Sequence, residues 1–282
     1  MTEGSAFRTL EVSDASLSPR CLRFLTVKSA ALRRRADMTL VLPEPGAGGP
    51  GRHWPIVILL HGIYGSHWAW TFKGGAWATG VRMMREGALP PMVLAMPSDG
   101  LHGDGSGYVP HASENSEAWI IDEVPQAVAE VVPECSAAAP CAIAGLSMGG
   151  FAALRLAAKY PARFVAAIGH SSITSTDQMD ALIEESRAEW SVSPVDQSIV
   201  QAVKLSEGLL PALHFDCGLE DPYLRENRAL HNALIEAGIS HAYAEYPGGH
   251  DWAYWAMRLP DSLRCAAQAF AASRRSLTDH AG

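Results

Sequence analysis

The sequence predicts an α/β fold in which a mostly parallel central sheet is covered by helices on both faces. Short apolar runs alternate with longer segments of helical composition through most of the 282 residues, which is the pattern of a parallel sheet with crossover helices. Apolar residues make up 48% of the chain, enough to fill one large core. We therefore expect residues 1–282 to form a single domain.

The predicted strands follow one another in a simple order. Strands at residues 22–28 and 38–42 should form an antiparallel edge, before a Pro/Gly-rich turn at 43–51. The core strands are expected at residues 56–60, 92–96, 142–146, 165–170, 212–217 and 241–245.

Two connecting segments need separate comment. The helix expected before Pro133 contains Pro125, which is tolerated if Asp122 caps the helix and places the proline in its first turn. Residues 171–210 form a long connection that we expect to be a small cap or lid, with a helix at 177–190.

The sharpest chemical signal is the motif Gly145-Leu146-Ser147-Met148-Gly149. It stands between a predicted buried strand at 142–146 and a predicted Ala/Leu-rich helix at 148–160. G-x-S-x-G in this setting is typical of a nucleophile elbow, which holds a serine on a strained turn. The motif alone is common, so a Gly-rich connection with a solvent-facing serine is the alternative. The context favours Ser147 as a nucleophile.

A serine nucleophile needs a base, and the base needs an acid to orient it. Asp221 lies in a turn-rich loop after the strand at 212–217, and His250 lies in a Gly-rich turn before the last helix. This is the order Ser, Asp, His. Asp216 would lie inside the strand and Glu220 is one residue away in the same loop, so both compete for the role of the acid, with Asp221 favoured.

Catalysis by a serine also needs backbone donors for the oxyanion. The Met148 amide, directly after the serine, is one candidate, and the Ile63 amide, after the strand at 56–60, is the other. The alternative for His61-Gly62 is an ordinary turn at the end of a strand.

These segments resemble the α/β-hydrolase esterases of the esterase D, tributyrin esterase and antigen 85 type. The matching motifs are I-L-L-H-G-I from residue 58 with Trp70 downstream, G-L-S-M-G-G from 145, D-C-G-L-E-D from 216 and Y-P-G-G-H-D-W from 246. The resemblance implies an α/β-hydrolase fold, a Ser147–Asp221–His250 triad, and an oxyanion hole from Ile63 and Met148. It also implies hydrolysis of carboxylic esters with small acyl groups and no cofactor. The stretch 171–210 looks longer than in compact members.

Four tryptophans near the motifs are candidates for binding substrate. Trp68, Trp70 and Trp252 flank the motifs, and Trp190 ends the predicted helix of the cap segment. Aromatic side chains can line an acyl or alcohol pocket, although packing in the core is an equally good interpretation for any one of them.

Composition excludes several other classes. The net charge is −8 and the only basic run, Arg33 to Arg35, is short, so no nucleic-acid partner is expected. The first residues lack the charged and apolar regions of a signal peptide, and no apolar run is long enough to span a bilayer. We expect a soluble cytoplasmic protein without membrane contact.

The cysteines give no sign of a structural framework. The five cysteines are scattered without C-x-x-C spacing, so we expect reduced thiols, no disulfide and no metal site. The expected partner is a small-molecule ester, and the sequence leaves the oligomeric state open, including a homo-oligomer.

The leading hypothesis is thus a serine carboxylesterase that works through an acyl-enzyme. The same residues would serve an acyltransferase that passes the acyl group to an alcohol or thiol, or a thioesterase of the S-formylglutathione hydrolase type. A non-catalytic binding protein that keeps the fold is the remaining alternative.

Overall fold

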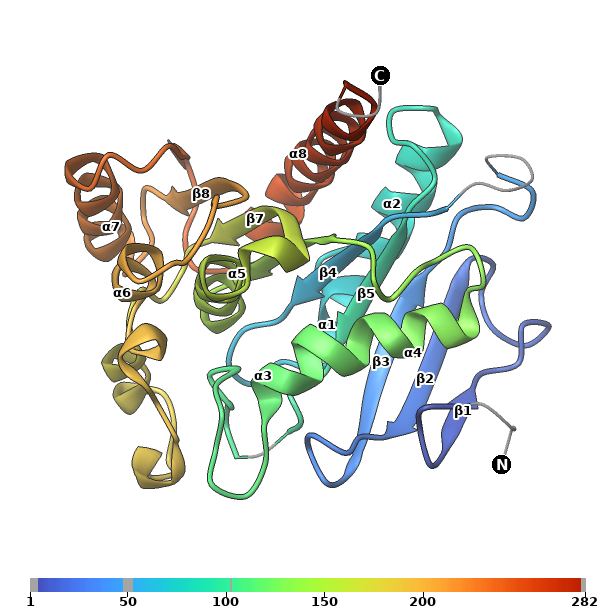
Figure 1. Ribbon diagram of the computed structural model, residues 1–282, viewed down its shortest axis with the longest axis horizontal. Helices are drawn as coiled ribbons and strands as arrows, with labels where there is room; N and C mark the ends of the chain where they lie inside the picture. The colour runs from blue at the N-terminus through green and yellow to red at the C-terminus, as the bar shows by residue number, and fades with distance from the viewer. Residues whose placement is uncertain (1–4, 48–52, 102, 280–282) are drawn as a thin grey trace.

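The core of the protein is one nine-stranded sheet. The computed structural model describes residues 5–47, 53–101 and 103–279. The strand order is β1-β2-β3-β5-β4-β6-β7-β8-β9 (Figure 1). The strands are β1 Leu10–Val12, β2 Leu22–Lys28, β3 Arg35–Val41, β4 Ile56–Leu60, β5 Val93–Pro97, β6 Cys141–Leu146, β7 Phe164–His170, β8 Ala212–Gly218 and β9 Ala242–Tyr246.

The sheet changes from antiparallel to parallel after its first three strands. β1, β2 and β3 pair antiparallel, and β3 also pairs antiparallel with β5. From β5 to β9 every pairing is parallel. The predicted antiparallel edge and parallel core are therefore confirmed, and the carboxyl ends of six parallel strands meet at one edge, where open α/β sheets bind their ligands. Residues 48–51 of the predicted turn lie outside the described residues.

Helices cover both faces of the sheet, as predicted. One core packs α4, α5, α6 and α7 against the sheet, and a second core packs α1, α2 and α8 against the opposite face. Figure 1 shows α4 crossing in front of β2 and β3. The α-helices are α1 Ala69–Phe72, α2 Ala76–Arg85, α3 Ser116–Ala118, α4 Val124–Val131, α5 Met148–Lys159, α6 Ile199–Lys204, α7 Leu224–Glu236 and α8 Trp252–Asp279.

The helix that contains Pro125 begins earlier than predicted. Asn115 caps it by accepting a hydrogen bond from Ala118 N, and α3 continues through a π-helical segment, Trp119–Glu123, into α4. The predicted cap at Asp122 is therefore wrong, because Asp122 lies in mid-helix. Proline can be accommodated there because the carbonyl four residues earlier, that of Ile121, accepts a hydrogen bond from Arg163 instead.

The segment between β7 and β8 is not helical where a helix was predicted. Residues 177–190 contain only short 3₁₀ turns at Thr176–Ala181 and Arg187–Glu189. Backbone groups that a helix would use are bonded elsewhere: Leu182 O accepts from the Tyr64 hydroxyl, and Glu184 N donates to Asp104. These tertiary bonds compete with helix formation in this stretch.

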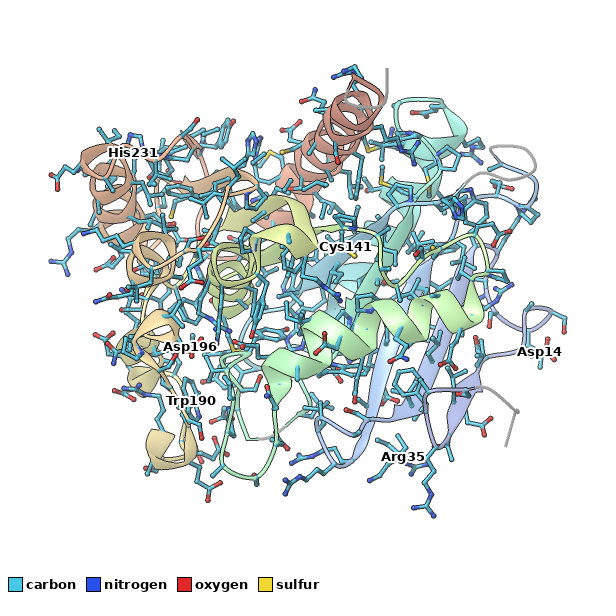
Figure 2. All side chains as sticks on the ribbon, in the orientation of Figure 1. Asp14, Arg35, Cys141, Trp190, Asp196 and His231 are labelled. Atoms are coloured by element: carbon cyan, nitrogen blue, oxygen red, sulfur yellow. The ribbon has the colours of Figure 1, made fainter. Side chains whose placement is uncertain are left out.

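A buried ion cluster fixes this segment to α5. Arg155 is fully buried and its guanidinium donates to Glu117, Asp196 and the Tyr108 carbonyl. Lys159 Nζ lies 2.8 Å from both carboxylates, so two cations face two anions. Asp196 is labelled in Figure 2, on the segment that also carries Trp190. A cluster that satisfies its own charges can be buried, whereas removal of one member leaves an uncompensated charge.

Asp196→Asn is expected to lower the free energy of unfolding by about 3 kcal/mol at neutral pH, because it leaves the buried cations short of one carboxylate. Burial acts to raise the pKa of Asp196, but Arg155, Lys159 and Ser193 outweigh it and hold that pKa below 3.8. The stabilisation is therefore complete above about pH 4 and is lost as the pH falls through the folded-state pKa. Urea unfolding from neutral to acidic pH should show wild type and variant converging at the acidic end.

Asp180→Asn is the matched control for this prediction. Asp180 also pairs with an arginine of the same segment, Arg187, but the pair is exposed. Removing this exposed pair should lower the free energy of unfolding far less than Asp196→Asn does. If Asp180→Asn lowered the free energy of unfolding as much as Asp196→Asn, burial would not be the cause of the Asp196 effect.

Candidate active site

Ser147 lies on a strained turn between β6 and α5. Its backbone has φ 54° and ψ −118°, a conformation that costs energy for a residue with a side chain. The flanking glycines make room for the turn: a Cβ on Gly145 would strike the Gly149 backbone, and one on Gly149 would strike the carbonyls of Leu60 and His61. The G-x-S-x-G spacing is thus required by the close approach of β6, α5 and the end of β4.

The structure brings Ser147, His250 and Asp221 together. Ser147 Oγ lies 3.1 Å from His250 Nε2, and His250 Nδ1 lies 2.9 Å from Asp221 Oδ2. With its proton on Nδ1, the neutral imidazole donates to the carboxylate and accepts from the serine hydroxyl. Residues separated by 103 positions along the chain thereby form one hydrogen-bonded series.

Asp221 is held in its ionised form. Burial acts to raise its pKa, but hydrogen bonds from His250, the Ser171 side chain and the Tyr223 amide lower it, and the net pKa lies below 3.8. The Tyr223 N–H donates to Asp221 Oδ1 at 2.8 Å, leaving the other oxygen for His250. A carboxylate with this set of donors remains charged at neutral pH and orients the imidazole.

The competing acids have other partners. Asp216 accepts hydrogen bonds from Tyr254 and pairs with His170, inside the sheet. Glu220 accepts from the backbone N–H of Gly248 at 2.6 Å. Of the three carboxylates considered from the sequence, Asp221 is the one bonded to His250.

The two predicted oxyanion residues lie close to Ser147. Met148 N follows the serine directly at the start of α5, and Ile63 lines the same cavity as Ser147. In the part of the chain that the structure describes, neither amide donates a hydrogen bond to the protein. Two amides without an internal acceptor beside a serine hydroxyl are suited to receive a developing oxyanion.

His61 orients the Ile63 amide. The ring Nε2 accepts from Asp99 N at 3.2 Å, which assigns the proton to Nδ1, and Nδ1 lies 2.8 Å from Gly62 O. The Gly62 carbonyl and the Ile63 N–H belong to one planar trans peptide and point in opposite directions. Holding the carbonyl toward His61 therefore turns the Ile63 N–H away from it. The sequence placed His61-Gly62 in the oxyanion loop, with an ordinary turn as the alternative, and indicated no role for the His61 side chain.

His61→Gln is expected to lower kcat about tenfold to hundredfold with little change in KM. The oxyanion forms only in the transition state, so a misaligned donor affects kcat rather than substrate binding. The measurement is steady-state hydrolysis of p-nitrophenyl acetate. His67→Gln is the control, because His67 bonds Thr39 rather than Gly62. A wild-type kcat in His61→Gln would contradict the assignment.

A cavity of about 500 Å³ opens beside Ser147. Apolar and aromatic side chains form most of its wall, and Lys73 and Asp251 contribute charge. Two of the aromatic residues are exposed at the surface, Tyr64 at 70% and Trp68 at 42%. Further aromatic or large apolar residues of the wall are Ile63, Leu146, Leu182, Tyr223, Trp252 and Trp255.

Two of the four predicted tryptophans line this cavity and two do not. Trp68 and Trp252 are part of its wall. Trp70 is buried behind it, where its indole donates to Leu60 O and its ring packs edge-on against Trp252. Trp190 lies elsewhere, against His111, with the ring centroids 5.4 Å apart. The placement of Trp70 and Trp190 in the pocket was wrong, because Trp70 is buried in the core and Trp190 packs, half-buried, on the opposite core cluster.

Three aromatic residues of the wall were missed. Tyr64 follows the oxyanion residue Ile63, Tyr223 is two residues after Asp221, and Trp255 lies in the first turn of α8. Tyr223 and Trp255 contact the His250 ring, with centroids 5.1 Å and 5.0 Å away. Their closeness in sequence to the motif residues was a signal that could have identified them.

The described residues lack two kinds of feature. They contain no group of three or more His, Cys, Asp or Glu side chains arranged to hold a metal ion. No described helix is long and apolar enough to cross a bilayer. The five cysteines are free thiols.

The chain matches one family model and several known esterases. A family model described as "Putative esterase" matches residues 29–265. An acetyl esterase of Caldicellulosiruptor saccharolyticus is 28% identical over 216 residues, which cover 70% of this chain and 77% of that protein. An esterase of Mycobacterium tuberculosis is 26% identical over 272 residues, and the match covers 86% of this chain and 58% of that protein.

A solved structure extends the likeness to three dimensions. A ferulic acid esterase aligns with a TM-score of 0.76 over 93% of this chain and 99% of that one. At 22% sequence identity this likeness shows a common fold.

Proposed function

The chain belongs to the "Putative esterase" family, whose members are carboxylic ester hydrolases, and we propose that it hydrolyses small esters through an acyl-enzyme on Ser147. His250 is the general base and acid, and Asp221 orients it. The Ile63 and Met148 amides bind the oxyanion. No cofactor enters the proposal.

The proposed reaction has two halves. Ser147 Oγ attacks the ester carbonyl while His250 Nε2 takes its proton, and the carbonyl oxygen becomes an oxyanion that the two amides bind. The oxyanion collapses, the bond to the alcohol breaks, and His250 returns the proton to the leaving alcohol. Water then repeats the attack on the acyl-enzyme, and the carboxylic acid leaves.

One observation carries this proposal: the hydrogen-bonded series from Ser147 through His250 to Asp221, on a strained turn beside two amides that donate to no acceptor among the described residues. A serine that served only packing would need neither the strained backbone nor a base within hydrogen-bond distance.

The cavity supports an ester with an apolar acyl or alcohol group. About 500 Å³ is within the range of small-molecule sites. Tyr64 and Trp68 expose aromatic surface at its mouth, which a substrate would cover. The relatives named as acetyl esterase and ferulic acid esterase suggest a small and an aromatic acyl group, and the volume admits either.

The test combines labelling with a substrate series. A fluorophosphonate probe should modify Ser147, as located by peptide mass spectrometry, and block hydrolysis in proportion to labelling. Rates on p-nitrophenyl esters from acetate to decanoate should peak at short chains and fall once the chain outgrows the cavity. Modification of another residue with Ser147 untouched, or a lack of ester turnover, would overturn the proposal.

A further inference from the structure

A second series of Asp, His and Ser side chains lies next to the first. His170 Nδ1 lies 2.9 Å from Asp216 Oδ2, and His170 Nε2 lies 2.6 Å from Ser262 Oγ. All three side chains are buried. Ser262 is inside α8, where backbone N–H groups serve the helix, so it has no oxyanion site of its own. The Asp216–His170–Ser262 series is therefore structural rather than a second catalytic triad.

Tyr254 connects this series to the beginning of α8. Its hydroxyl donates to Asp216 Oδ1 at 2.6 Å, so that Tyr254 and His170 occupy the two oxygens of one carboxylate. Burial, the largest influence, raises the pKa of Tyr254 far above its usual value, which keeps the hydroxyl protonated as a donor. A buried hydrogen bond to a charged acceptor is among the stronger ones in proteins.

The first turn of α8 also determines where His250 lies. A Cβ on Gly248 would come within 2.7 Å of Tyr254 Cδ2, so the Tyr254 ring packs directly on the His250 loop. Trp255, the next residue, packs edge-on against the His250 ring at 5.0 Å and 87°. Movement of this turn would carry the imidazole with it.

The backbone of Asp216 is also linked to the acid Asp221. Asp216 lies in β8, which leads directly into the loop of Asp221, and Asp216 O accepts from Ser171 N at 2.8 Å. The Ser171 side chain hydrogen-bonds to Asp221 and accepts from Trp255 Nε1 at 3.2 Å. Asp216 therefore connects two parts of the site. It lies in the strand that leads to Asp221, and it is hydrogen-bonded to the helix that follows His250.

We propose that Tyr254, through its hydrogen bond to Asp216, is a positioning residue that holds His250 against Asp221. It touches neither the substrate nor the reacting atoms and acts through the first turn of α8. This inference rests on the proposed function, since it assigns Tyr254 a part in the same proton transfer.

Tyr254→Phe tests the inference, because it removes the hydroxyl and keeps the ring that packs on Gly248. We expect kcat to fall about tenfold with KM nearly unchanged, as small displacements of catalytic groups cost rate. The acid limb of the pH–rate profile should move to lower pH, because a less well placed carboxylate stabilises the imidazolium less. Tyr243→Phe is the matched control: it removes a hydroxyl bonded to Glu245 on β9 and should leave both readouts unchanged.

Ser262→Ala, which removes one partner of His170, provides a second variant if Tyr254→Phe fails to fold. It should shift kcat and the pH profile in the same direction by a smaller amount. Wild-type kcat and pH profile in the folded variants would overturn the inference, even if their melting temperatures fall. Labelling of Ser147 in the wild type, measured in parallel, separates the two failures: an unreactive serine defeats the proposed function itself, and the inference falls with it.

Discussion

Ser147→Ala is expected to lower kcat/KM for p-nitrophenyl acetate by roughly five orders of magnitude. Without the hydroxyl there is no acyl-enzyme, and His250 and Asp221 have no proton to transfer, so the three residues fail as a unit. The remaining rate would come from the oxyanion amides acting on a water molecule. So low a rate has to be measured with concentrated enzyme and long incubations, after which the released product is quantified.

The stability of this variant should not fall with its activity. Alanine keeps the Cβ that makes a φ of 54° unfavourable, so the substitution does not change the backbone strain. It removes the side-chain hydrogen bond to His250. Thermal unfolding should therefore remain near that of wild type, and the exposed substitution Ser16→Ala should change neither property. Retention of more than a small fraction of the activity by Ser147→Ala would contradict the nucleophile assignment.

Asp221→Asn is expected to reduce kcat by about four orders of magnitude. The asparagine amide group can donate to His250 Nδ1, which would place the imidazole proton on Nε2, where it cannot accept from Ser147. The Tyr223 and Ser171 contacts can persist, so the fold should be retained. The measurement is single-turnover hydrolysis with a chromogenic ester.

Glu220→Gln provides the comparison, since Glu220 is the adjacent carboxylate. Its contact is with Gly248 N, and an amide oxygen can accept the same hydrogen bond. Its rate should remain close to that of wild type. An equal fall in kcat in the two variants would mean that catalysis depends on the conformation of this loop rather than on the Asp221 carboxylate.

Local patterns were sufficient to predict the part of the site that lies on the strand ends. β6, the elbow and α5 occupy consecutive residues, so one stretch of sequence contains both the strand and the glycines that the turn requires. Asp221 and His250 each follow a strand, β8 and β9, and parallel strands bring their carboxyl ends to one edge. The positions of Ser147, Asp221 and His250 after these strands were therefore enough to predict that the three residues lie close together.

Features that depend on distant contacts could not be predicted in this way. The absence of a helix at 177–190 follows from bonds to Tyr64 and Asp104, more than 70 residues earlier. The continuation of the helix through Pro125 depends on Arg163, which donates a hydrogen bond to Ile121 O. The positions of Trp70 and Trp190 were predicted wrongly because the sequence does not show which side of a short helix or turn faces the core.

The cavity beside Ser147 has walls from separate parts of the chain. Tyr64 and Trp68 come from the connection after β4, Leu182 from the segment before β8, Tyr223 from the loop before α7, and Trp252 from α8. The machinery around Ser147, by contrast, tolerates no added Cβ at its glycines. Mutational drift can therefore alter each wall separately while the chemistry stays intact, and libraries that randomise one wall at a time should find altered ester preferences without loss of catalysis.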